Sequence, residues 1–424
     1  MTSPVRLVLI GSGDRGNTYA KYAVSTGRAV VVAVAEPDPE RAARARTAYP
    51  EAEIHDDWRQ LTDRQRFADA VLVTTQDADH VEPAVAFAEL GYHIQLEKPM
   101  ATSEADVHRI IDAVEQAGVM LAVCHVLRYT PYTRGLKEIV DGGLLGEIVS
   151  VEHLEPVGWW HQAHSYVRGN WRREADATPM LLAKSSHDLD WLSYIVGRPV
   201  HRVSSFGGLK HFRAEQRPEG AADRCLDCSL EPSCPYSAKR LYVGSLGDPD
   251  RERWPLAVVT AARTEQGVLD ALRESPYGRC VYDCDNDVVD HQVVTLEYDG
   301  GATASFTMTA FTDYTQRKTR IFGTHGQLEG DGVHVTVTDF RTGQTHRLTL
   351  GLEGADAGTG HGGGDERLVD AFLDALTTGD PSRILSDPRT SLESHQVAWA
   401  AERARHNGTV ETLPGRPLAT GQRS

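Results

Sequence analysis

Apolar runs and helical patterns alternate regularly through the first 125 residues. The apolar runs, each short enough to form one strand, occupy residues 7–10, 29–35, 68–75, 92–96 and 120–125. Segments with apolar residues at helical spacing lie between them, at residues 17–25, 37–49, 81–90 and 103–117. Strands and helices that alternate at this pace predict a parallel sheet covered by helices.

The pattern changes beyond about residue 130. Longer runs of alternating apolar and polar residues, separated by turns such as Asp299-Gly300-Gly301, are typical of an antiparallel sheet. These runs occupy residues 147–154, 200–206, 288–298, 302–310, 319–322 and 333–339. Further helix patterns occupy residues 132–141, 179–196, 365–377 and 388–406.

A glycine-rich turn follows the first apolar run. In the sequence Gly11-Ser12-Gly13-Asp14-Arg15-Gly16, the first glycine allows a tight turn and the second lets the backbone approach a pyrophosphate. The N–H groups at the start of the next helix favour the phosphate charge. The turn therefore predicts a dinucleotide site whose contacts include Gly11, Ser12, Gly13, Asp14 and Arg15.

The acid at the end of the second predicted strand bears on the choice of cofactor. Glu36 is placed to accept hydrogen bonds from a ribose diol and to repel a 2′-phosphate, which favours NAD over NADP. Arg15 and Arg41 are nearby cations, so NADP stays the less favoured alternative.

With 424 residues, the chain is long enough for two or three domains. We predict an α/β Rossmann domain with a doubly wound parallel sheet over residues 1–126. An α+β domain with a large, mostly antiparallel open sheet is expected over residues 127–424. That second domain contains a cysteine-rich insert at about 210–287, where strand pattern is scarce.

Polar residues follow two of the predicted parallel strands. Gln76-Asp77-Ala78-Asp79-His80 comes after one strand, and Glu97-Lys98-Pro99 ends the next. In a doubly wound sheet, ligands lie outside these carboxyl ends. The predicted cofactor contacts from these segments are Thr75, Gln76, His80, Glu97 and Lys98.

The order of the motifs resembles the glucose–fructose oxidoreductase and inositol dehydrogenase family (Gfo/Idh/MocA). The resemblance covers nearly the whole chain and rests on Gly11–Gly16, Glu97-Lys98-Pro99, Arg128-Tyr129 and the helix with His187-Asp188-Leu189-Asp190. It implies a Rossmann domain and a second domain whose sheet covers the active site and often makes subunit contacts. We therefore expect a homo-oligomer, either a dimer or a tetramer. The resemblance also implies hydride transfer between a nicotinamide and a sugar or polyol carbon.

The resemblance gives catalytic roles to two residues. Lys98 would touch the substrate hydroxyl and tune its proton transfer, unless it only pairs with Glu97. His187 would accept the proton or hold the substrate, although a helix histidine is often structural. The family commonly has an aspartate four residues before this histidine, where this chain has Ala183. Lys184 shares a helix face with His187, so it is either a candidate base or a solvated lysine.

The segment between Trp159 and Trp171 is rich in aromatic and polar residues. Aromatic faces stack on sugar rings and polar groups satisfy hydroxyls, so the segment predicts a substrate loop, with a packed surface loop as the alternative. His361, before a run of glycines, is a weaker candidate. The predicted substrate contacts are His125, Arg128, Tyr129, His161, His164, Arg168 and Trp171.

Five of the six cysteines lie in the insert. Their spacing suits a tetrahedral Zn²⁺ with Zn–S distances of about 2.3 Å. Such a structural zinc would staple an insert whose own core is thin. Free or partly oxidised thiols are the alternative. The predicted ligands are Cys225, Cys228, Cys234 and either Cys280 or Cys284, with Cys280 favoured.

Charge and composition narrow the partners. A net charge of −16 disfavours nucleic acid and anionic membranes, because both need a basic face. No apolar run approaches the roughly 18 residues of a membrane span. The N-terminus leads into a strand without a signal segment. We therefore expect a cytoplasmic protein that binds a small-molecule carbohydrate.

Three functions fit these observations. The first is an NAD-dependent oxidoreductase that acts on a sugar, sugar derivative or cyclitol. The second is an NAD-dependent glycosidase, which oxidises C3 transiently, eliminates the aglycone, adds water and returns the hydride. The third is a non-catalytic sugar or nucleotide sensor, and the presence of both Lys98 and His187 argues against it.

Overall fold

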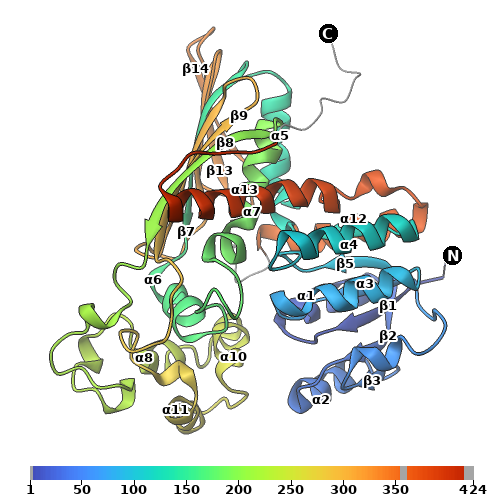
Figure 1. Ribbon diagram of the computed structural model, residues 1–424, viewed down its shortest axis with the longest axis vertical. Coiled ribbons are helices and arrows are strands. Elements are labelled where there is room, and N and C mark those ends of the chain that lie inside the picture. Colours follow the sequence, from blue (N-terminus) through green and yellow to red (C-terminus); the bar gives the residue numbers. More distant parts are fainter. Residues whose placement is uncertain (1–2, 354–360, 415–424) are drawn as a thin grey trace.

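The computed structural model describes residues 3–353 and 361–414, which are organised by two sheets (Figure 1). The first sheet has six strands in the order β3-β2-β1-β4-β5-β6, and its neighbouring strands are parallel. This is the order of a doubly wound dinucleotide-binding sheet, so the predicted fold class is confirmed. The strands are β1 (Val5–Ile10), β2 (Ala29–Ala35), β3 (Glu53–His55), β4 (Ala70–Val73), β5 (His93–Leu96) and β6 (Leu121–Val123).

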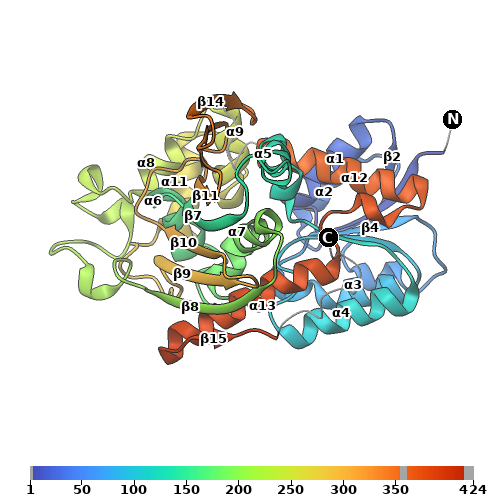
Figure 2. The ribbon, with the colours of Figure 1, turned by 90° about the horizontal axis from the view of Figure 1, so that it is seen from above.

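Helices cover both faces of this sheet. Figure 2 shows α1 (Asp14–Ser25) and α12 (Gly364–Thr378) on one side, with α3 (Val81–Glu89) and α4 (Glu104–Ala117) on the other. The helix α12 was expected in the second domain, yet its apolar side packs with α1 and β1 in one core cluster. The domain boundary at residue 126 stays a prediction. The helix α12, from far beyond this boundary, completes the helical layer on one face of the first sheet. The remaining helix of this layer is α2 (Pro39–Ala48).

The second sheet has nine strands in the order β14-β13-β12-β11-β7-β10-β9-β8-β15. All neighbouring strands are antiparallel except β7 and β10, so the predicted mostly antiparallel sheet is confirmed. The strands are β7 (Ile148–Pro156), β8 (Val200–Gly208), β9 (His291–Tyr298), β10 (Thr303–Thr309), β11 (Lys318–Gly323), β12 (Gly326–Gly330), β13 (His334–Asp339), β14 (Gln344–Thr349) and β15 (Glu411–Thr412).

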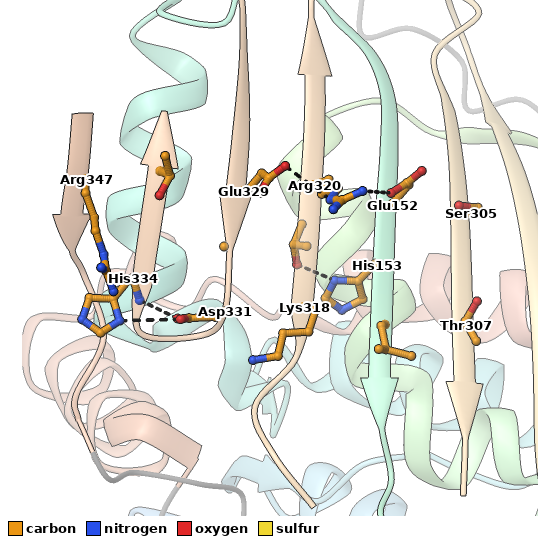
Figure 3. A pocket seen from close by; sticks show the side chains of 14 residues that line it. Glu152, His153, Ser305, Thr307, Lys318, Arg320, Glu329, Asp331, His334 and Arg347 are labelled. Atoms are coloured by element: carbon orange, nitrogen blue, oxygen red, sulfur yellow. Dashed lines mark hydrogen bonds and ion pairs between the residues drawn. The ribbon is translucent and has the colours of Figure 1, made fainter. Parts of the chain in front are cut away.

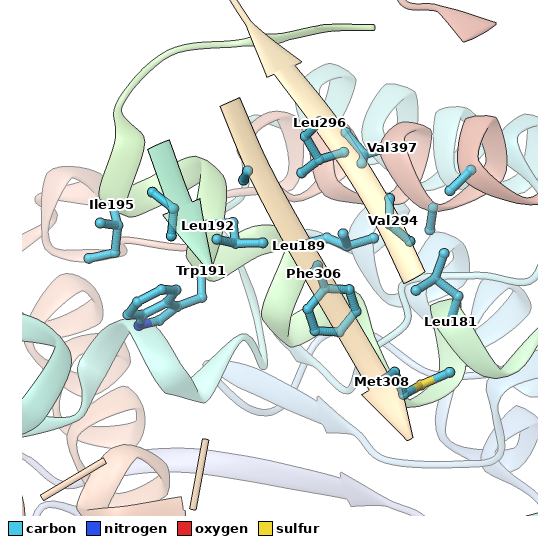
Figure 4. Packing of buried hydrophobic residues seen from close by; sticks show 14 of the residues in the cluster. Leu181, Leu189, Trp191, Leu192, Ile195, Val294, Leu296, Phe306, Met308 and Val397 are labelled. Carbon is cyan, nitrogen blue, oxygen red and sulfur yellow. The ribbon is translucent and has the colours of Figure 1, made fainter. Parts of the chain in front are cut away.

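One face of the second sheet carries the largest core. Helix α7 (Met180–Val196) packs on it, and α13 (Pro388–Asn407) packs beside α7. Figure 4 shows Phe306 and Val294 of the sheet against Leu189 of α7. Helix α13 also reaches the first sheet's layer, because His395 accepts a hydrogen bond from the N–H of Met100. The helix α5 (Pro131–Asp141) also contributes to this core, through Tyr132 and Leu136.

The other face of the second sheet is open and polar. A shallow hollow of about 680 Å³ lies on it. Figure 3 shows Arg320 between Glu152 and Glu329, at 3.7 Å and 3.5 Å. None of the three predicted catalytic residues lines this hollow. The chemistry must therefore be sought on the helix-covered side.

The cysteine-rich insert connects β8 and β9, which are antiparallel neighbours. The insert therefore takes the place of a short hairpin turn between these two strands. Figure 1 shows it beneath the sheet, next to α6 (Trp159–His161). It contributes to two small apolar clusters, one of which also includes Ala163, Val167 and Ala310 from outside the insert. Its helices are α8 (Ala238–Val243), α9 (Pro249–Arg251), α10 (Ala257–Val259) and α11 (Glu265–Glu274).

Arg128 and Asp190 form a buried ion pair between the short helix η3 (Val126–Tyr129) and α7, with N–O distances of 2.6 Å and 2.8 Å. Removing one partner leaves a buried charge uncompensated. We expect Asp190→Asn to lower the free energy of unfolding by about 3–5 kcal/mol, measured by urea denaturation. The control Glu297→Gln, which breaks an exposed pair with Arg202, should cost at most about 1 kcal/mol. Equal costs for the two variants would contradict the assignment.

Candidate active site

The glycine turn lies at the carboxyl end of β1, and its glycines have different surroundings. Gly11 has a φ of +84°, and a Cβ there would lie 2.7 Å from the carbonyl oxygen of Thr74. A Cβ at Gly16 would lie 2.3 Å from the carbonyl oxygen of Gly11. A Cβ at Gly13 would meet nothing within 4 Å. The first and third glycines therefore serve the packing of the turn, whereas Gly13, before α1, leaves room for a pyrophosphate.

Glu36 is buried at the end of β2, directly beside this turn. One carboxylate oxygen accepts a hydrogen bond from the N–H of Ser12 at 2.7 Å. The other accepts from the N–H of Asp38 at 3.0 Å and from Nε of Arg41 at 3.1 Å. The carboxylate thus lies where an adenosine ribose would reach it, and it neutralises Arg41. This arrangement fits NAD.

Arg15 is held in a network that joins three elements. Its guanidinium donates to Glu97 and to Asp365 of α12, each at 3.0 Å. The hydroxyl of Tyr19 also donates to Glu97, at 2.6 Å. Burial alone would raise the pKa of Glu97, but Arg15 and Lys98 outweigh it and lower the pKa. The side chain of Arg15 therefore fixes the Glu97 corner and is already committed there, which removes it as a 2′-phosphate ligand.

Lys98 follows β5 and is half-buried. Its Nζ donates to the carbonyl oxygen of Ala183 on α7, at 2.7 Å, so the two layers meet at this atom. Burial lowers the pKa of Lys98, and the nearby charge of Lys184 lowers it further. Glu97 and Asp77 oppose this effect without cancelling it. An ammonium whose pKa is lowered releases its proton more readily than an ordinary lysine.

The two polar strand ends are tied together. The ring of His80 lies between the carbonyl oxygens of Pro99, at 2.7 Å from Nδ1, and Thr75, at 3.2 Å from Nε2. The hydroxyl of Thr75 donates to the carbonyl oxygen of Asp79. Gln76 lies at the start of the same short turn. These three predicted cofactor contacts therefore shape the rim of the site beside the Lys98 corner.

Asp77 belongs to this site and was absent from the predicted residues. It is buried and accepts a hydrogen bond from Nε1 of Trp171, at 3.2 Å. Burial raises the pKa of Asp77, and this effect outweighs the lowering by His80 and Lys98. The sequence held a signal for it, because Asp77 lies in the polar segment that follows β4.

Histidine rings form a row behind Lys98. The ring centroid of His187 lies 5.8 Å from that of His125 and 5.8 Å from that of His361. Within the described part of the chain, Nδ1 of His187 and both ring nitrogens of His125 have no hydrogen-bond partner. Burial lowers the pKa of His187 well below its usual range, and Lys98 and His125 add to this effect. At neutral pH the imidazole of His187 is therefore uncharged.

A balanced group of charges lies next to this row. Nζ of Lys184 lies 3.1 Å from Glu155 of β7, and Arg317 lies 2.9 Å from the other oxygen of Glu155. Arg317 also binds Asp188 of α7. Burial would raise the pKa of Asp188, but Arg317 and His153 lower it overall. Lys184 is thus an ion-paired residue of the site rather than a solvated helix lysine.

The predicted substrate loop divides into two parts. His161 and Trp171 lie toward the site. Burial lowers the pKa of His161 well below the usual range, and the nearby charges of Lys184 and Lys98 lower it further. His164 and Arg168 instead lie in the core of the insert. His164 contacts the hydroxyl of Tyr242 at 2.8 Å, and burial lowers its pKa to about 3. The π-helix η4 (Gln162–Arg168) carries both away from Lys98.

Arg128 and Tyr129 are also used by the fold rather than presented to the site. Arg128 pairs with Asp190 and donates to the carbonyl oxygen of Leu385. The Tyr129 hydroxyl accepts hydrogen bonds from the N–H groups of Leu385 and Ser386, at 2.9 Å and 3.2 Å. Of the residues predicted after the last Rossmann strand, only His125 lies beside His187.

The predicted zinc site is not found. Among the residues that the structure describes, no group of three or more His, Cys, Asp or Glu side chains could hold a metal ion. The guanidinium of Arg168 lies among the cysteines and donates to Cys225 at 3.4 Å. Burial raises the pKa of Cys280, and it raises that of Cys284 to about 11. The thiols, including those of Cys228 and Cys234, are free and the buried ones pack as small apolar groups.

Known proteins resemble either most of the chain or a part of it. The oxidoreductase YteT of Bacillus subtilis is 26% identical over 369 residues, which is 81% of this chain and 82% of YteT. A 2,7-anhydro-N-acetylneuraminate hydratase of Escherichia coli is 27% identical over 143 residues, 34% of this chain and 37% of that protein. A solved levoglucosan dehydrogenase, in complex with NADH and levoglucosan, has a TM-score of 0.70 at 19% identity, covering 97% of this chain and 100% of that one.

Two family models match consecutive parts of the chain. The NAD-binding Rossmann-fold model of an oxidoreductase family matches residues 5–125. The C-terminal alpha/beta-domain model of the same family matches residues 137–413. Together they cover both sheets and the residues that meet at Lys98. The chain therefore belongs to the Gfo/Idh/MocA family of oxidoreductases.

Proposed function

We propose that the protein transfers a hydride between NAD and a ring carbon of a sugar, sugar derivative or cyclitol. One contact carries the proposal. Nζ of Lys98 donates a hydrogen bond to the carbonyl oxygen of Ala183 on α7, and Ala183 lies one helical turn before the neutral His187. The solved neighbour that holds NADH and levoglucosan supports a nicotinamide cofactor and a sugar-like substrate. Gly13 and Glu36 would hold the cofactor, which supplies the hydride chemistry when bound.

The chain's own residues would manage the hydroxyl proton. Lys98, with its lowered pKa, would donate a hydrogen bond to the substrate oxygen and stabilise negative charge on it. An imidazole nitrogen of His187 would take the proton as the carbonyl forms. The Lys184–Glu155 pair would keep the surrounding charge balanced. A panel of sugars and cyclitols, monitored by the absorbance of NADH, tests the proposal.

A redox-neutral reaction is the second candidate, because one relative is named as a hydratase rather than a dehydrogenase. In this reaction a transient C3 ketone acidifies the C2 hydrogen, the aglycone leaves, water adds and the hydride returns. The site offers His161 and Lys184 as additional groups near C2. Release of an aglycone without net NADH, with deuterium at C2 after turnover in deuterated water, would favour this candidate over the first.

In the described ranges, no helix is long and apolar enough to cross a membrane.

We also propose a homo-oligomer that uses the open face of the second sheet. The open face offers charged side chains together with exposed Phe206 and Val293. Sedimentation should give a dimer or a tetramer, and a variant with Val293→Arg should dissociate further than the wild type.

The cofactor preference should depend on Glu36. We expect Glu36→Ala to lower kcat/KM with NAD by about 10- to 100-fold, because a charge-assisted hydrogen bond to the ribose is lost. The value with NADP should fall less, since Arg41 loses its carboxylate partner and can face a 2′-phosphate. Steady-state kinetics with both cofactors measure the ratio. Glu40→Ala, an exposed change on α2, is the control, and an unchanged ratio in Glu36→Ala would contradict the ribose assignment.

A further inference from the structure

A groove lined by aromatic side chains lies between the substrate loop and the insert. Its volume is about 530 Å³. We call it the aromatic groove and define it by Trp160, Trp254, Tyr314, Arg251, Asp250 and Asp313. None of these residues has a role in the proton transfer proposed above.

The rings of the aromatic groove form a continuous wall. The centroid of Trp160 lies 5.2 Å from that of Trp254 and 5.0 Å from that of Tyr314. The guanidinium of Arg251 lies over the Trp160 ring, at 5.6 Å. Trp160 and Trp254 are only half-buried, so part of each indole is accessible. Such a wall offers flat apolar area at low cost in conformational entropy.

Charged groups accompany these rings. The carboxylates of Asp250 and Asp313 and the guanidinium of Arg251 line the same groove. A pyranose ring has one apolar C–H face and an edge of hydroxyl groups. Aromatic faces match the first, and carboxylate and guanidinium groups match the second. The chemistry of the groove therefore suits a sugar ring better than a purely apolar segment.

The aromatic groove lies next to the site around Lys98. His161 lies between them, with its ring centroid 4.9 Å from Trp254 and 5.3 Å from Tyr314. Arg317, three residues after Tyr314, pairs with Glu155, which in turn pairs with Lys184. A substrate longer than one ring would therefore project toward the groove at His161.

The insert contacts the cofactor-binding layer. Arg253, next to Trp254, lies 3.5 Å from Asp14 at the start of α1. This contact brings the aromatic wall to the side of the glycine turn. The part of a substrate that projects from the reacting ring would therefore meet the insert rather than bulk water.

We propose that the aromatic groove is a subsite for a second pyranose ring, so that the substrate is a disaccharide or a larger saccharide. The reacting ring lies at Lys98 and His187, and in this respect the inference rests on the proposed function. The second ring stacks on Trp254 and Trp160 while its hydroxyl groups meet Asp250, Asp313 and Arg251.

Matched substrates test the subsite. Glucose, galactose and mannose are compared with disaccharides and p-nitrophenyl glycosides that carry each as the non-reducing ring, with NAD⁺ present. Both NADH and the released group are measured. We expect a disaccharide to exceed its monosaccharide in kcat/KM by about tenfold or more. Trp254→Ala should reduce this ratio by about tenfold, and Trp254→Phe should retain part of it. Phe340→Ala, an exposed change after β13, should leave the ratio unchanged.

The other outcomes are distinct. A preference for monosaccharides, or an equal loss for both substrates in Trp254→Ala, would overturn the subsite. A preference for the p-nitrophenyl glycosides over every disaccharide would also overturn it, in favour of an aromatic aglycone. If no compound is turned over, the proposed function fails, and tryptophan fluorescence titrations of the NAD-loaded protein with the same sugars decide the subsite. Tighter binding of a disaccharide that is lost in Trp254→Ala would support it, and equal binding of mono- and disaccharides would overturn it.

Discussion

Replacing Lys98 with alanine is expected to lower kcat by about 10²- to 10⁴-fold while NAD still binds with nearly the wild-type affinity. The reason is positional. Nζ of Lys98 is held at the junction of the two layers by the carbonyl oxygen of Ala183, and Glu97 contacts its backbone N–H at 2.8 Å. The other lysine placed in this site, Lys184, is paired with Glu155. Steady-state kinetics and calorimetric titration with NAD measure the two quantities separately.

Two matched variants sharpen this experiment. Lys98→Arg keeps a positive charge, but its planar guanidinium is larger and presents its donors in a different geometry from an ammonium, so it should not restore turnover. Lys21→Ala, an exposed change on α1, should leave kcat and NAD affinity unchanged. If Lys98→Ala loses NAD binding instead, Lys98 is a residue of the cofactor site, and the proposed proton role is wrong.

The sequence pattern predicted most elements because burial imposes a period on each of them. The runs at 29–35 and 333–339 match strands within one residue at either end. Four strands were missed, because each is too short or has too few apolar residues to show that period in the sequence. The strand β3 has three residues, β14 is exposed at every position, β12 contains two glycines in five residues, and β15 has two residues.

The pattern could not predict which layer a distant helix joins. Helix α12 has an apolar face that would fit either sheet. Its Leu368 and Phe372 pack with Leu7 and Leu9 of β1, more than 350 residues earlier in the chain. Helical periodicity fixes the face that is buried, but the partner depends on tertiary packing.

The site was predictable where a topological rule applies. Parallel strands end at the same edge, so their positions after strands place Glu36, His80 and Lys98 at one edge of the sheet, while their roles stay predictions. Glu155 and Arg317 follow no such rule, because they reach Lys184 from β7 and from the segment before β11. Only the folded sheet brings these charges together.

Spacing was a poor guide in the insert. The interval between Cys225 and Cys228 suits a metal, but it says nothing about where the thiols point. The substrate loop stays a prediction, but helical geometry turns two of its candidates, His164 and Arg168, toward the insert. Composition identifies a segment, whereas backbone direction decides which of its side chains reach the site.

A glutamine in place of His187 should lower kcat/KM for sugar oxidation by about 10²- to 10⁴-fold and change the pH profile. During oxidation His187 must be neutral to accept the hydroxyl proton. Burial, Lys98 and His125 lower its pKa, so the neutral form persists at more acidic pH than in an ordinary histidine, whose pKa is about 6.5. In the wild type, kcat/KM should therefore decline on the acidic side only below about pH 6.5.

The pH profile separates this role from a structural one. If His187 accepts the proton, His187→Gln should lose the acidic decline in kcat/KM, because glutamine does not titrate. If His187 only packs, the substitution would change the size of kcat/KM and leave the shape of its pH profile intact. His108→Gln, an exposed change on α4, should reproduce the wild-type curve. A decline centred above pH 6.5 in the wild type, or one that survives in His187→Gln, would show that another group accepts the proton. The adjacent His125, whose ring nitrogens have no partner in the described chain, would be the first to replace in that case.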